Sequence, residues 1–74
     1  MKPINATITR IDSEVWVTDE NGIIKKVENA CRYDEPDAIV LNPDKVDYEV
    51  VLAKVGDYCQ VIETETGCKI IKIN

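Results

Sequence analysis

The chain of 74 residues has room for one domain, residues 1–74, and carries a net charge of −5 without any histidine. Affinity for nucleic acid comes from neutralising phosphates, so the acidic balance disfavours a nucleic-acid partner. The absence of histidine excludes His-based catalytic triads and His-containing metal sites.

Two strands and a tight turn are predicted at the start of the chain. Residues 4–11 and 14–19 are rich in β-branched side chains that alternate with polar ones, and Asp12-Ser13 separates them as a turn. In the second strand Val15 and Val17 share one face, which places Trp16 on the other face. Trp16 is therefore either an exposed contact residue or part of a second small core.

The first hairpin is completed by residues 23–28. Asn21-Gly22 between two apolar runs is a strong hairpin signal, and a three-residue loop is predicted from Glu20 to Gly22. That loop length sets Val15 opposite Val27 and Val17 opposite Lys25, with Trp16 beside Lys26.

The middle of the chain allows two interpretations. A short strand at 30–33 is followed by a break at 34–37, where Pro36 keeps the preceding residue out of the helical region, and by a short apolar strand at 38–41. Asn42-Pro43 then resembles a helix start, which would give a helix over 43–55. We favour a strand at 48–55, because the apolar residues there surround a helical wheel and include several valines.

The chain closes with a second predicted hairpin, formed by residues 58–64 and 68–73. A three-residue loop at 65–67 with a left-handed Gly67 sets Glu63 opposite Lys69, Val61 opposite Ile71, and Cys59 opposite Ile73. This register leaves one face wholly apolar.

These elements predict an all-β fold: a small antiparallel barrel or curled sheet, SH3-like or OB-like, of five to seven short strands. The alternative is an α+β fold with one helix at about 43–55. Because a core this small is marginal and at least one sheet edge is unpaired, we also expect self-association, with a homodimer as the simplest form.

The three thiols predict no catalytic nucleophile and no disulfide framework, and Cys31, next to Arg32, and Cys68 are candidates for reaction with an added reagent. Cys59 lies on the predicted apolar face as an inert core thiol, whereas Cys68, next to Lys69 near a turn, is expected to be partly exposed. No Cys-x-x-Cys spacing suggests a metal site, and no cofactor is expected. The chain starts without the apolar run of a signal peptide, so we expect a cytoplasmic protein with free thiols.

The residue pattern indicates a binding protein and not an enzyme. Acidic residues crowd the two loops that flank 38–41, where they suit a partner-binding edge, and aromatic side chains supply anchors. The candidate partner-binding residues are Trp16, Tyr33, Asp34, Glu35, Asp37, Asp44 and Asp47. No catalytic residue is predicted.

The predicted function is that of a small acidic protein–protein binding module whose partner has a basic surface. The small size, the net charge of −5 and the absence of a predicted catalytic group also suit an inhibitor or accessory protein encoded by a phage or mobile element. The alternatives are a nucleic-acid- or ribosome-associated small barrel and a structural or assembly subunit.

Overall fold

The computed structural model describes residues 2–74 and consists of eight strands. The strands are β1 (Ile4–Ile11), β2 (Val15–Asp19), β3 (Ile24–Val27), β4 (Ala30–Arg32), β5 (Ala38–Leu41), β6 (Glu49–Leu52), β7 (Tyr58–Thr64) and β8 (Gly67–Ile73). The all-β prediction is confirmed. Each of the eight strands corresponds to a segment predicted as a strand, so the count exceeds the expected five to seven by one.

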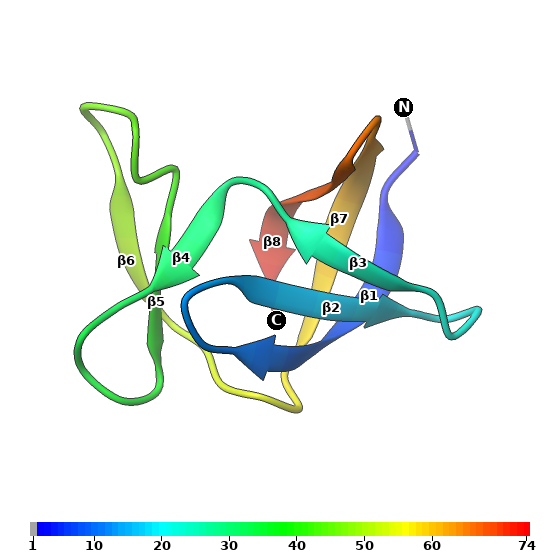
Figure 1. Ribbon diagram of the computed structural model, residues 1–74, viewed down its shortest axis with the longest axis horizontal. Coiled ribbons are helices and arrows are strands. Elements are labelled where there is room, and N and C mark those ends of the chain that lie inside the picture. Colours follow the sequence, from blue (N-terminus) through cyan, green and yellow to red (C-terminus); the bar gives the residue numbers. More distant parts are fainter. Residues whose placement is uncertain (1) are drawn as a thin grey trace.

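Five strands close into a barrel in the order β1-β2-β3-β8-β7, and β7 pairs back onto β1. All pairs are antiparallel except β3–β8, which is parallel and is short, with Val27 opposite Cys68. This Greek-key order, with the last two barrel strands exchanged, fits an OB-like barrel. Strands β4, β5 and β6 form a second sheet in the connection between β3 and β7, and they stand beside the barrel (Figure 1).

A single apolar core joins the two sheets. Inward-facing Ile8, Val15, Val17 and Val61 of the barrel are completely buried. Ile39 of β5 is also completely buried and belongs to the same cluster, so the inner face of the second sheet packs against the barrel.

The first hairpin has the predicted register. Val15 lies opposite Val27, Val17 opposite Lys25, and Trp16 opposite Lys26. Gly22 takes the positive φ of 80° that this three-residue loop requires.

The prediction for the second hairpin is wrong at the turn. The loop has only two residues, so Glu63 lies opposite Cys68 and Val61 opposite Ile70, while Gly67 is a strand residue opposite Thr64. An irregularity between Gln60 and Val61 restores the expected pairing of Cys59 with Ile73.

The alternative of a helix at 43–55 is also wrong. Asn42 adopts a positive φ of 54° and its carbonyl accepts the Lys45 N–H at 3.0 Å, so the chain turns where the helix would start. The strand interpretation is confirmed, although β6 is shorter than the predicted 48–55. No helix among residues 2–74 is long and apolar enough to cross a membrane.

Candidate functional site

The net charge of the protein is concentrated in one stretch of the chain, residues 34–49. Of the 14 acidic and 9 basic residues, six acidic and one basic lie there, which leaves eight of each sign elsewhere. We call residues 34–49 the acidic segment. It comprises β5, the loops at both ends of β5, and the first residue of β6. Its carboxylates are Asp34, Glu35, Asp37, Asp44, Asp47 and Glu49, all exposed.

The carboxylates of the acidic segment differ from those of the barrel in their partners. The ion pairs among residues 2–74 join Arg10 to Asp12, Lys25 to Asp19 and Glu63, Lys26 to Glu14, and Lys54 to Asp57. None of them includes a carboxylate of the acidic segment. The segment therefore presents a concentrated negative field that no cation of the described chain neutralises at ion-pair distance.

The outer face of the second sheet is apolar. Directly opposite residues of antiparallel strands share a face, so Cys31, Val40 and Val50 form one row across β4, β5 and β6, and Ala38 and Leu52 form the next. Leu52 is 84% exposed and Val50 is 46% exposed. We call the side chains of Cys31, Val40, Val50 and Leu52 the outer face.

Backbone geometry holds the acidic loops at the two ends of the outer face. Asp37 precedes β5 with φ of 60°, and Asn42 follows it with φ of 54°. Such left-handed residues bend the chain sharply, and they cost energy in any residue with a side chain. The Asp37 carbonyl accepts the Ala53 N–H at 3.0 Å, and the Asn42 N–H donates to the Asn29 carbonyl at 2.7 Å. An apolar surface is thus bordered by acids at both ends.

Substitution of Asp37 separates the roles of its backbone and its charge. Asp37→Gly relieves the left-handed conformation, whereas Asp37→Ala keeps it without the polar side chain that tolerates it. We expect the alanine variant to be less stable than the glycine variant by about 1 kcal/mol in urea unfolding. Equal stabilities of the two variants would contradict a strained Asp37.

Two open clefts adjoin the second sheet. One, of about 550 Å³, lies where the second sheet meets the barrel and includes Tyr33, Glu35 and Asp37 in its lining. The other, of about 470 Å³, lies between β6 and the end of β8 and includes Leu41, Val51 and Ile73. The predicted site residue Tyr33, half-buried, therefore shares a cleft with two of the predicted acidic residues.

Trp16 lies apart from the other predicted site residues. It is half-buried on the outer surface of the barrel, where its neighbours across the strands are Arg10 on β1 and Lys26 on β3. Both cations are already paired, Arg10 with Asp12 at 2.6 Å and Lys26 with Glu14 at 2.7 Å. Glu14 raises the pKa of Lys26, and the Glu14 N–H and Arg10 lower the pKa of Asp12. Trp16 thus belongs to a second, electrically balanced surface.

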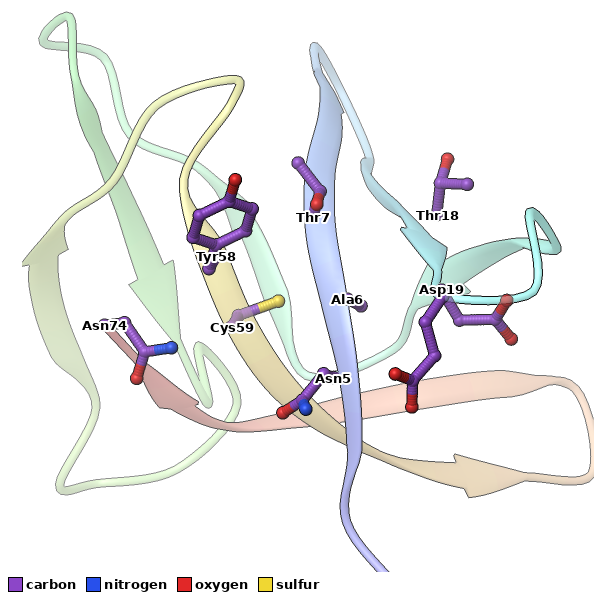
Figure 2. A pocket seen from close by; sticks show the side chains of 9 residues that line it. Asn5, Ala6, Thr7, Thr18, Asp19, Tyr58, Cys59 and Asn74 are labelled. Atoms are coloured by element: carbon purple, nitrogen blue, oxygen red, sulfur yellow. The ribbon is translucent and has the colours of Figure 1, made fainter.

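A third hollow, of about 380 Å³, lies along β1 between β2 and β7, where Tyr58 stands beside Thr7 on the adjoining strand (Figure 2). Asp19, which also lines this hollow, is the one buried carboxylate among residues 2–74. It accepts the N–H groups of Asn21 and Ile23 at 2.9 and 3.0 Å, and it lies 3.8 Å from the Lys25 Nζ. Asp19 therefore shapes the β2–β3 turn, a role that sequence reasoning missed.

Asn29 is a second structural residue that the sequence did not reveal. Its side-chain amide donates to the Ile70 carbonyl at 2.9 Å and accepts the Ile70 N–H at 2.8 Å. It thus continues the β3–β8 pairing as a backbone peptide would, at the point where the chain leaves the barrel for β4. The asparagine fixes the position of the second sheet relative to the barrel.

The three cysteines are free and differ in burial. Cys59 is a buried core thiol, as predicted. Cys68 is completely buried, so the expectation of partial exposure is wrong, because the two-residue turn puts Cys68 on the inner face. Burial raises the pKa of both thiols to about 11. No group of three or more Cys, Asp and Glu side chains among residues 2–74 is arranged to hold a metal ion.

Thiol labelling should distinguish these positions. Cys31 is half-buried on the outer face, whereas Cys59 and Cys68 are buried and protonated at neutral pH. We expect iodoacetamide at pH 8 to modify Cys31 alone in the folded protein and all three thiols in urea, as read by mass spectrometry. Early modification of Cys59 or Cys68 in the folded protein would contradict the described core.

Comparison with known proteins gives no relative for this chain: no family model, no curated protein and no solved structure matches it.

Proposed function

We propose that this protein is a non-enzymatic protein-binding module whose contact surface is the outer face together with the acidic segment. The observation that supports this most is that the acidic segment contains the entire excess of acidic residues and borders the exposed apolar outer face at both ends. Protein interfaces have an apolar centre with a polar rim, and charge at the rim selects partners and accelerates association.

The partner that fits this surface is a basic protein with an apolar patch. Six carboxylates without ion-pair partners favour Lys and Arg on the opposing surface. Basic surfaces include the grooves that hold nucleic acid, so we propose that the protein acts as an inhibitor or accessory factor by occupying such a surface. We propose that it is a cytoplasmic protein of the phage or mobile-element type.

Affinity capture from a cell lysate, run with and without nuclease, tests the proposal when it includes charge variants. Asp34→Asn/Asp47→Asn removes two carboxylates of the acidic segment. Glu20→Gln/Glu65→Gln removes two exposed carboxylates from turns of the barrel and is the matched control. We expect one protein partner to survive nuclease, to be lost from the first variant, and to be kept by the control. Equal capture by both variants would place the contact surface elsewhere.

The arrangement around Trp16 supports a second candidate, a small barrel that binds single-stranded nucleic acid. An aromatic side chain between two cations is a platform on which a base can stack, and the chain outside the acidic segment carries equal numbers of acidic and basic residues. Trp16 is the only tryptophan, so its fluorescence reports on this surface. Salt-sensitive quenching by oligo(dT) favours this candidate, and unchanged fluorescence rules against it.

Self-association stays a prediction. A homodimer formed through the second sheet would bring two acidic segments together, so we expect it to need high salt, which screens like charges. Sedimentation velocity at low and high ionic strength measures this dependence.

A further inference from the structure

Strand β6 is one of the two edge strands of the second sheet, the other being β4. In the order β4-β5-β6 it pairs only with β5, along four consecutive residues in regular register. Its other side meets no strand among the described residues (Figure 1).

The direction of the free backbone groups on β6 follows from its pairing. The Ala53 N–H donates to the Asp37 carbonyl, and hydrogen bonding toward one neighbour alternates along an antiparallel strand. Val51 and Glu49 therefore also point their backbone groups toward β5. Val50 and Leu52 point theirs outward, and no backbone partner among residues 2–74 engages these outward groups.

This edge strand is short, but it lacks most of the other features that usually prevent a strand from pairing with another chain. Natural edge strands carry lysines, prolines or bulges. Strand β6, Glu49-Val50-Val51-Leu52, has neither lysine nor proline, and its register is unbroken. Its one charge is the carboxylate of Glu49, which repels acidic chains and attracts basic ones.

Both sides of the edge offer apolar contacts to an added strand. On one side the outer face would extend from Val40 and Val50 onto the newcomer. On the other side lies the cleft of about 470 Å³ that includes Leu41, Val51 and Ile73. An added strand would therefore find apolar side chains on both of its faces, although Glu49, Lys72 and Asn74 also line the cleft.

We propose that β6 binds an extended segment of a basic partner protein by strand addition, with apolar side chains at its centre and Lys or Arg at both ends. The inference rests on the proposed function and specifies its partner. The basic ends face Asp34, Glu35 and Asp37 at one end of the second sheet and Asp44 and Asp47 at the other. A second copy of β6 fits less well, because it brings carboxylates to both ends.

The peptide Lys-Lys-Val-Ile-Val-Val-Lys-Lys, blocked at both termini, is a suitable probe of the full chain. We expect binding that weakens with salt and that slows hydrogen exchange of the Val50 and Leu52 amides by about tenfold or more, measured by NMR. The same peptide with Glu at the flanking positions should not bind. A version N-methylated at alternate central residues keeps the side chains and removes the backbone donors, and it should bind about tenfold more weakly.

A pair of protein variants distinguishes backbone hydrogen bonding from side-chain contact by changing β6 instead of the peptide. The Val50 N–H points away from β5, so Val50→Pro removes an outward donor without breaking the ladder, as edge strands tolerate. Val50→Ala shortens the side chain and keeps the donor. We expect Val50→Pro to weaken peptide binding about tenfold more than Val50→Ala does. If Val50→Pro fails to fold, the N-methylated peptide still tests whether binding depends on backbone hydrogen bonds to β6.

The remaining outcomes separate this inference from the proposed function. Peptide binding with unchanged Val50 and Leu52 exchange, or equal binding of the N-methylated peptide, overturns strand addition but leaves the outer face as the contact surface. Absence of peptide binding at any salt also overturns strand addition, whereas the proposed function is decided by the charge variants in affinity capture. Protection of the same amides by a second copy at raised protein concentration overturns the choice of a basic partner.

Discussion

Asn29→Ala should lower the free energy of unfolding by about 2–4 kcal/mol, because it leaves a buried backbone N–H and C=O of Ile70 without partners. A domain of this size has a total stability of only about 4–11 kcal/mol, so the loss is a large fraction. Urea unfolding followed by Trp16 fluorescence measures it.

The control for this prediction is Asn5→Ala. The Asn5 amide oxygen accepts a hydrogen bond from the Gln60 side chain at 3.3 Å on the exposed surface, so we expect a change below about 0.5 kcal/mol. Equal effects of the two alanine variants would show that Asn29 does not hold the second sheet to the barrel.

Gly67→Ala should destabilise the barrel by about 3 kcal/mol, at the upper end of the range for overpacking. A Cβ on Gly67 would overlap the backbone carbonyl oxygen of Lys26, where β3 and β8 close the barrel. Backbone cannot move aside as a flexible side chain can. Thermal and urea unfolding both measure the loss.

Gly22→Ala is the control for this prediction, and its loss of stability is compared with that of Gly67→Ala. A Cβ on Gly22 meets no atom, and the cost there is only that of a positive φ, about 1 kcal/mol. If Gly22→Ala proves as destabilising as Gly67→Ala, close approach of β3 and β8 is not the reason for the glycine.

Gly22 and Gly67 show how well the residues of a turn predict the loop length of a hairpin in this fold. Asn21-Gly22 and Thr66-Gly67 look alike in sequence, and both were assigned to three-residue loops. The first assignment is confirmed because the Asp19 N–H donates to the Ile23 carbonyl at 2.9 Å beyond the last strand pair, which leaves residues 20–22 as the loop. The second is wrong because Gly67 meets a constraint from a distant strand, and local sequence contains no sign of that contact.

In the rest of the fold, too, local sequence predicts some features, and contacts between residues distant in the chain determine the others. Alternation of apolar residues predicts the strands and the inward faces of Val15 and Val17. It does not predict the parallel closure through Val27 and Cys68 or the partition into a barrel and a second sheet, because both depend on contacts between residues far apart in the chain.

The candidate site was visible in the sequence only in part. The acidic loops flanking 38–41 were found, and the confinement of the net charge to 34–49 could have been found by counting along the chain. The exposed face of Val50 and Leu52 could not be predicted, because aliphatic residues pack in cores as readily as they line an edge. Trp16 was grouped with the acidic residues by residue type, and the topology places it on the barrel.

The most direct test of the central claim is the rate at which iodoacetamide modifies Cys31 in the purified complex with the captured partner, compared with the free protein. Cys31 is the native chemical probe of the outer face, and Trp16 is the fluorescent probe of the barrel. If the outer face is the contact surface, modification of Cys31 slows strongly and Trp16 emission stays unchanged. Unaltered Cys31 reactivity together with a shifted Trp16 emission would contradict the proposed function and move the contact surface to the barrel.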